Sequence, residues 1–227
     1  MTPSEPYYRR NLALIHHLGF AFHAERCAPG ILARLRPVQA AGGVVLELGC
    51  GSGLLTRELV AAGHRVIATD ASPAMLELAR ETAPGTEELR VLVLPDDPLP
   101  PCDAVVAIGH PLSYLPDEAT LDLCDLRWGE VRRDRPPHAF VEDDWALVTR
   151  FSLPRPNLFV RDMTTFVRAE DGTWLRDDEV HDNVLIDTSL VPPLLAEHGV
   201  VVEVRDSFGD EELDDGLVTI VGTKPVT

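Results

Sequence analysis

The chain has 227 residues, 45% of them hydrophobic, and a formal net charge of −17 at pH 7. This length and hydrophobicity suit one α/β domain with a substantial core, while the acidic balance excludes nucleic acid and anionic membranes as expected partners, because phosphate binding needs a basic face. No apolar run is long enough to cross a bilayer, the first residues lack the layout of a signal peptide and the cysteines show no paired spacing, so we expect a cytoplasmic protein with reduced thiols.

The N-terminal segment is predicted to be helical over residues 7–35. Apolar residues recur there at helical spacing, and a break is expected at Pro29-Gly30. We expect residues 1–40 to form a helical lid. Three residues with metal-binding side chains fall near one face of the predicted helix: His16, His23 and Cys27. Zinc sites usually take ligands from more than one element, so we predict no metal site.

A strand, a tight glycine turn and the start of a helix follow one another from Val44. The apolar run includes one acidic residue, Glu47, and glycines then stand at alternate positions: Gly49, Gly51 and Gly53. A helical pattern begins directly after them. Glycine lets backbone N–H groups approach a ligand closely, so this turn predicts a site for a small molecule that contains a nucleoside.

A second predicted strand, Arg65–Asp70, also ends in an acidic residue. Asp70 follows the glycine turn by about 20 residues, the spacing at which a carboxylate accepts hydrogen bonds from both ribose hydroxyls. A nicotinamide dinucleotide satisfies this pattern too. Glu47 instead favours a ligand with an ammonium or sulfonium group, because a carboxylate at the end of the first strand would repel a pyrophosphate. The Tyr-x-x-x-Lys pair of short-chain dehydrogenases is absent, since Lys224 is the only lysine.

The next elements complete a predicted parallel sheet. Ser72 is placed to cap a helix that has Pro73 in its first turn, and two further strands are expected at residues 89–94 and 104–108. Near-continuous apolar character in these strands indicates a parallel sheet that is covered on both faces. We expect residues 41–130 to form the ligand-binding core.

The pattern changes beyond residue 138, where long runs mix apolar and polar residues. The alternation predicts antiparallel strands at three places: residues 145–151, 158–167 and 174–186. Asp171-Gly172 is typical of a hairpin turn. We expect residues 140–186 to form an antiparallel insertion. The remainder, residues 187–227, is predicted to hold a helix from Ser189 to His198 and the last two strands.

Three segments of the chain resemble the class I S-adenosylmethionine-dependent methyltransferases. They are Glu47–Gly53, Asp70–Leu76 and Cys102–His110. The resemblance implies a single methyltransferase domain over residues 1–227. It has a Rossmann-like, mostly parallel sheet with flanking helices, and an antiparallel insertion before the last two strands. The resemblance also implies S-adenosylmethionine as the cofactor and a small metabolite as the methyl acceptor.

The resemblance further assigns cofactor-binding roles to ten residues. The glycines let the backbone pass close to the methionine and the ribose, Glu47 lies near the methionine amino group, and Asp70 takes the ribose hydroxyls. The residues after Asp70 border the adenine, and Asp96 or its neighbour Asp97 reaches the adenine amino group. The full set is Glu47, Gly49, Cys50, Gly51, Gly53, Asp70, Ala71, Met75, Asp96 and Gly109.

His110 is the candidate catalytic residue. It follows the fourth predicted strand at the edge where ligands meet an open α/β sheet, and a neutral imidazole accepts a proton from a hydroxyl or ammonium group. The alternative is a histidine that only orients a backbone group or lines the cleft.

The predicted activity is methyl transfer to an oxygen or nitrogen atom of a small metabolite. Two alternatives stay open. One is an S-adenosylmethionine-binding protein without catalysis, suggested by an abnormally short crossover after the fourth strand, at residues 110–128. The other is a nicotinamide-dependent oxidoreductase.

Overall fold

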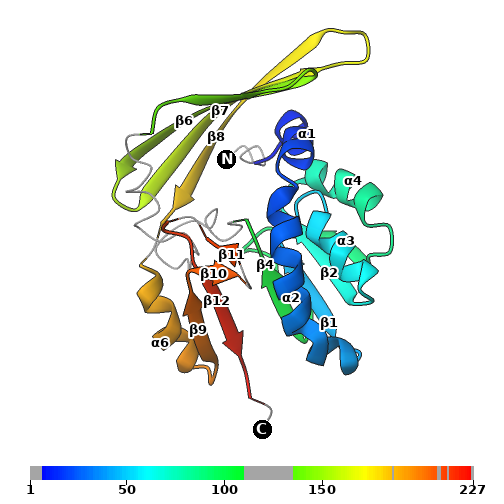
Figure 1. Cartoon of the computed structure of the whole chain (residues 1–227), viewed down its shortest axis with the longest axis vertical. Helices are drawn as coiled ribbons and strands as arrows, with labels where there is room; N and C mark the ends of the chain where they lie inside the picture. The colour runs from blue at the N-terminus through cyan, green and yellow to red at the C-terminus, as the bar shows by residue number, and fades with distance from the viewer. Residues whose placement is uncertain (1–6, 110–134, 186, 209–210, 214, 226–227) are drawn as a thin grey trace. The chain divides into compact units, whose positions relative to one another are not determined.

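The computed structural model describes residues 7–109, 135–185, 187–208, 211–213 and 215–225 (Figure 1). The chain divides into two compact units. Unit 1 comprises Met1–Pro111, His138–Thr149 and Met163–Glu179, and unit 2 comprises Leu112–Pro137, Arg150–Asp162 and Val180–Thr227. The predicted crossover at residues 110–128 and the candidate His110 lie outside the described residues.

A four-stranded parallel sheet forms the centre of unit 1. Its strand order is β3-β2-β1-β4, and its strands are β1 (Val44–Leu48), β2 (Arg65–Asp70), β3 (Glu88–Val91) and β4 (Ala104–Ala107). In register, Leu48 lies opposite Thr69 on one side and Ala107 on the other, so these three strands end at one edge. The prediction of a mostly parallel sheet is confirmed, although β3 stops earlier than the expected residue 94.

Two helices follow the first two strands, where the glycine and proline patterns placed them. Helix α3 (Leu54–Ala61) begins directly after Gly53, and α4 (Pro73–Thr82) begins after Ser72. The Ser72 Oγ accepts a hydrogen bond of 3.2 Å from the Met75 N–H, which satisfies a backbone donor that the first turn of a helix leaves unpaired. This confirms the predicted cap.

The N-terminal segment forms two helices rather than one interrupted at Pro29-Gly30. Helix α1 (Arg10–Gly19) ends well before that break, and α2 (Phe22–Ala40) continues through Pro29. A tertiary contact accompanies the actual break, since a Cβ on Gly19 would lie 2.9 Å from the Trp145 ring. Pro29 is exposed, while buried residues on either side of it keep the face of α2 packed. His16 therefore lies on a different helix from His23 and Cys27.

The antiparallel insertion is present as a four-stranded sheet. Its order is β5-β6-β7-β8, and its strands are β5 (His138–Val141), β6 (Trp145–Arg155), β7 (Leu158–Arg168) and β8 (Trp174–Val184). The sequence did not predict β5. The hairpin at Asp171-Gly172 is confirmed, with Gly172 at φ +85° and the Ala169 N–H donating to the Thr173 carbonyl. Strands β6, β7 and β8 contribute residues to both units.

An apolar cluster packs α1 against this sheet within unit 1. Leu12 and Ile15 of α1 meet four residues of β6 and β7, and all six are at most 9% exposed. The four strand residues are Trp145, Leu147, Met163 and Val167. Burying several large side chains in this way contributes about 1.5–3 kcal/mol for each. The packing fixes α1 on the sheet.

The last elements of the chain belong to unit 2. The predicted helix at residues 189–198 forms as a 3₁₀ turn, η2 (Thr188–Leu190), and a short helix, α6 (Val191–Ala196). The final long strands, β9 (Val201–Arg205) and β12 (Thr219–Thr223), pair antiparallel. Between them β10 (Ser207–Phe208) pairs with β11 (Glu211–Glu212). Within the described ranges, the helices are all too short or too polar to traverse a bilayer.

Candidate functional site

The glycine turn after β1 has room beside it at one glycine and none at another. A Cβ added to Gly51, at φ +55°, would meet only the Met75 sulfur, at 4.0 Å. A Cβ on Gly53, at φ +79°, would lie 3.0 Å from the Ala79 Cα. Gly53 therefore allows α3 and α4 to pack closely, whereas the space at Gly51 is open to a ligand.

Asp70 fastens this turn to the start of α4. Its Oδ2 accepts a hydrogen bond of 2.8 Å from the Gly51 N–H, and its Oδ1 accepts one of 2.8 Å from the Ser72 N–H. Burial raises the pKa of this carboxyl, and the N–H donors of Ser72, Gly51 and Ala71 lower it in part. A carboxylate offers about four acceptor positions, so Asp70 retains capacity for the hydroxyls of a sugar.

Glu47 is buried beneath the same turn. The side chain is 1% exposed, and the Thr56 Oγ1 donates to its Oε2 at 2.7 Å. Burial raises the pKa of Glu47 to about 8, the Thr56 hydrogen bond lowers it and the charge of Asp70 raises it further. Glu47 is therefore mostly protonated at neutral pH, and a cationic ligand nearby would favour its ionised form. The residue type alone did not predict Thr56 as its partner.

Cys50 lies inside the turn as a neutral thiol. It is 7% exposed, and its Sγ donates weakly to the Gly51 carbonyl. Burial raises the pKa of this thiol well above its ordinary value, and the charges of Glu47 and Asp70 add to the shift. The side chain can line a pocket, but it is not a nucleophile at neutral pH.

Further predicted cofactor residues lie on α4 and in the segments that follow β2, β3 and β4. Met75 is 2% exposed on α4, next to the glycine turn, and Ala71 is exposed directly after Asp70. Gly109 follows the end of β4, and the glycine turn follows the end of β1, so both lie at the carboxyl edge of the sheet. Asp96 is exposed in the loop after β3.

Two contacts to this site come from the N-terminal segment and were not predicted. The His17 Nδ1 lies 2.9 Å from the Ser52 Oγ in the glycine turn. The Ser72 Oγ, from the residue whose N–H bonds to Asp70, donates a hydrogen bond of 2.7 Å to the Tyr8 carbonyl. Both loops of the candidate site are therefore bonded to residues around α1. Because these pairs are 35 and 64 positions apart, no local pattern in the sequence indicates them.

Comparison with known proteins agrees with this geometry. Residues 45–125 match the model of a family described as a methyltransferase domain. Over 137 residues the chain is 37% identical to the trans-aconitate 2-methyltransferase of Azoarcus sp. (strain BH72), which covers 58% of this chain. The chain spans about half of that relative's length, 53%.

Two solved structures share the fold over nearly the whole chain. One is an S-adenosylmethionine-dependent methyltransferase from Clostridium acetobutylicum, with a TM-score of 0.73, 14% identity and coverage of 93% of this chain and 96% of the other. The second is the S-adenosylmethionine-bound amino pentose methyltransferase CalS10 from Micromonospora echinaspora, with a TM-score of 0.63, 18% identity and coverage of 96% and 98%. At these identities the likeness establishes a common fold.

Proposed function

We propose that this chain, which belongs to the class I S-adenosylmethionine-dependent methyltransferase family, transfers the methyl group of S-adenosylmethionine to an oxygen or nitrogen atom of a small metabolite. The single observation that carries the proposal is the pair of carboxylates beside the glycine turn, of which Asp70 is half-buried and Glu47 is buried. Asp70 bonds directly to the turn, and Glu47 lies beneath it.

The residues present fit this cofactor better than a dinucleotide. Asp70 keeps acceptor capacity for ribose hydroxyls after it has bonded Gly51 and Ser72. Glu47 and Asp70 are close enough for one charge to raise the other's pKa, which makes the site unfavourable for a pyrophosphate. A ligand with an ammonium and a sulfonium group reverses that penalty, because it stabilises both carboxylates in their charged form.

The chemistry needs positioning more than it needs reactive side chains. Bound S-adenosylmethionine supplies an activated methyl group. The glycine turn, Asp70 and Glu47 hold the cofactor, and orientation alone lowers a barrier of this kind by several kcal/mol, of order 7–11 in well-oriented systems. For the acceptor we assign His110 as the group that takes the proton from a hydroxyl or ammonium. Its neighbour Gly109 follows the end of β4, at the carboxyl edge of the sheet where β1 also ends.

The small size of the acceptor is supported by the relatives. The curated relative is named for trans-aconitate, and one structural neighbour is described as an amino pentose methyltransferase. These acceptors are a carboxylic acid and an amino sugar, so oxygen and nitrogen both stay in the proposal.

Calorimetric titration with S-adenosylhomocysteine tests the binding half of this proposal. We expect saturable binding by the wild type, and a loss of roughly tenfold or more in Asp70→Asn, because the charge-assisted hydrogen bonds of the carboxylate are removed. The matched control is Glu77→Gln, an exposed carboxylate on α4, which should bind as the wild type does. A folded wild type that binds no S-adenosylhomocysteine would overturn the proposal.

Transfer itself is tested with radiolabelled S-adenosylmethionine and a panel of carboxylic acids, amino sugars and phenols. Label in one of these acceptors, abolished in His110→Ala but with binding retained, is the expected result. A protein that binds the cofactor and labels no acceptor would favour the non-catalytic alternative.

A further inference from the structure

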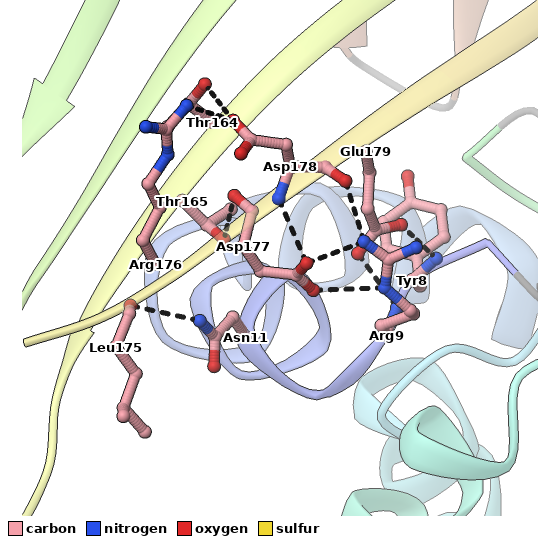
Figure 2. Close-up of polar contacts among 10 residues, drawn as sticks. All are labelled: Tyr8, Arg9, Asn11, Thr164, Thr165, Leu175, Arg176, Asp177, Asp178 and Glu179. Atoms are coloured by element: carbon pink, nitrogen blue, oxygen red, sulfur yellow. Dashed lines mark hydrogen bonds and ion pairs between the residues drawn. The ribbon is translucent and has the colours of Figure 1, made fainter.

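The backbone just before α1 is held by the side chains of one strand, β8. Glu179, 4% exposed, accepts the Tyr8 N–H on its Oε2 at 2.8 Å and the Arg9 N–H on its Oε1 at 2.9 Å (Figure 2). The Arg9 guanidinium pairs with both oxygens of Asp177, at 3.0 Å and 2.6 Å, and also donates to the Asp178 carbonyl. Asn11 of α1 adds a hydrogen bond of 3.1 Å to the Leu175 carbonyl. All of these residues belong to unit 1.

Tyr8 is fixed on both sides of its backbone. In the part of the chain that the structure describes, it is the single non-glycine residue with a positive φ, at 55°. A residue with a Cβ stays in this conformation only when its surroundings hold it there. The Tyr8 N–H is held by Glu179, and its carbonyl accepts from the Ser72 Oγ. Glu179 is thus joined to the candidate cofactor site through one strained residue.

Glu179 also caps the N-terminus of α1. The residue at the N-cap of this helix, Arg9, provides no side-chain cap of its own, and the Glu179 carboxylate accepts its N–H instead. A negative charge at this end of a helix is favourable because the helix dipole is positive there. At the far end of α1, His17 contacts Ser52 in the glycine turn.

We propose that Glu179, supported by the Arg9–Asp177 ion pair, is a positioning residue that sets the affinity of the site for S-adenosylmethionine. It holds Tyr8 against Ser72 and α1 against Ser52, and therefore both cofactor loops, although it lies on the antiparallel sheet. The route runs from Glu179 to Tyr8, from Tyr8 to Ser72 and from Ser72 to Asp70, and each link is a hydrogen bond. The inference rests on the proposed function, because the ligand is the one assigned there.

The consequence is a change in the fraction of protein that is ready to bind. When Tyr8 and α1 leave their places, Ser72 loses a partner, and the apparent affinity falls in proportion to the population that stays in place. Glutamine at position 179 keeps the length of the side chain but turns an amide towards one of the two N–H donors. We expect Glu179→Gln to weaken S-adenosylhomocysteine binding roughly tenfold, with most of the change in the dissociation rate.

The test compares variants of the full chain by calorimetry and by stopped-flow displacement of S-adenosylhomocysteine. Glu179→Gln and Asp177→Asn should both dissociate faster than the wild type. The matched control is Asp182→Asn, an exposed aspartate on the same strand, which should not change either value. If Glu179→Gln does not fold, Asp177→Asn alone can still test the proposal. The Asp177 side chain is 31% exposed, so its substitution should disturb the fold less than a substitution of the buried Glu179.

A charge exchange separates positioning from general stability. Arg9→Asp alone should weaken binding, and Arg9→Asp combined with Asp177→Arg should restore it to within about threefold of the wild type. Hydrogen exchange in the absence of ligand should show faster exchange at Tyr8, Arg9 and Ser72 in Glu179→Gln.

The two proposals fail differently. A folded wild type that does not bind S-adenosylhomocysteine defeats the proposed function. A wild type that binds, together with folded Glu179→Gln and Asp177→Asn variants that match its affinity and dissociation rate, overturns the positioning role alone.

Discussion

Glu47→Gln is expected to change how the stability of this protein depends on pH. Burial raises the pKa of Glu47 from 4.5 to about 8 in the folded protein, whereas the unfolded chain ionises this group at its ordinary value. Between the two values the folded protein holds a proton that the unfolded protein has released. The free energy of unfolding therefore falls as the pH rises through this range.

The size of the effect follows from the pKa shift. A change from 4.5 to about 8 corresponds to about 5 kcal/mol of lost stability between the two pH values, at about 1.4 kcal/mol per pKa unit. Little of the loss is present below the lower value, and nearly all of it has developed at the upper one. Glutamine keeps the shape and can still accept the Thr56 hydrogen bond, but it has no proton to release. The variant should therefore lack this slope.

Urea-induced unfolding of both proteins, at matched ionic strength and from about pH 5 to about pH 8, measures the difference directly. Asp70 also has a raised pKa, but it is present in both proteins and cancels in the comparison. We expect similar stabilities near pH 5 and a variant that is more stable than the wild type by several kcal/mol, up to about 5, near pH 8. A stability difference that stays constant with pH would refute the reasoning.

Two further predictions follow from the same site. Binding of S-adenosylmethionine near neutral pH should release up to about one proton from Glu47, because a cationic ligand favours the carboxylate form of this side chain. Calorimetric titrations in buffers of different ionisation enthalpy would detect the released proton. Equal heats of binding in all buffers would contradict the prediction. Gly53→Ala should destabilise the protein by about 1–3 kcal/mol, since it combines a positive φ with a Cβ 3.0 Å from the Ala79 Cα. The matched control is Gly172→Ala, because Gly172 has a φ of +85° and no atom lies within 4 Å of the new Cβ. Urea-induced unfolding should show a smaller loss of stability for Gly172→Ala than for Gly53→Ala. An equal loss of stability in the two variants would exclude the packing role of Gly53.

The cofactor half of the fold is predictable because its signals are local. The strands β1 and β2, the glycine turn and the Ser72 cap each depend on residues within about ten positions of one another. The antiparallel hairpin is equally local, since Asp171-Gly172 sets its turn.

The features that the sequence did not predict depend on distant partners. The break between α1 and α2 occurs where Gly19 meets the Trp145 ring, while Pro29, the strongest local signal for a break, is tolerated inside a helix. Strand β5 has little apolar alternation, and its Val141 is 71% exposed. Glu179 and Tyr8 are 171 positions apart. The domain boundaries and the roles of the ten cofactor residues stay predictions, and His110 lies outside the described residues.

The buried thiol of Cys50 lies in the glycine turn, where the proposed cofactor, a methylating agent, would bind. A methyl sulfonium compound is an alkylating agent, and a thiolate is the side chain most readily alkylated. Burial and two neighbouring carboxylates keep Cys50 protonated, and its Sγ points its proton towards the Gly51 carbonyl. In the proposed methyltransferase, the acidic surroundings that would favour a cationic cofactor would thus also protect Cys50 from methylation.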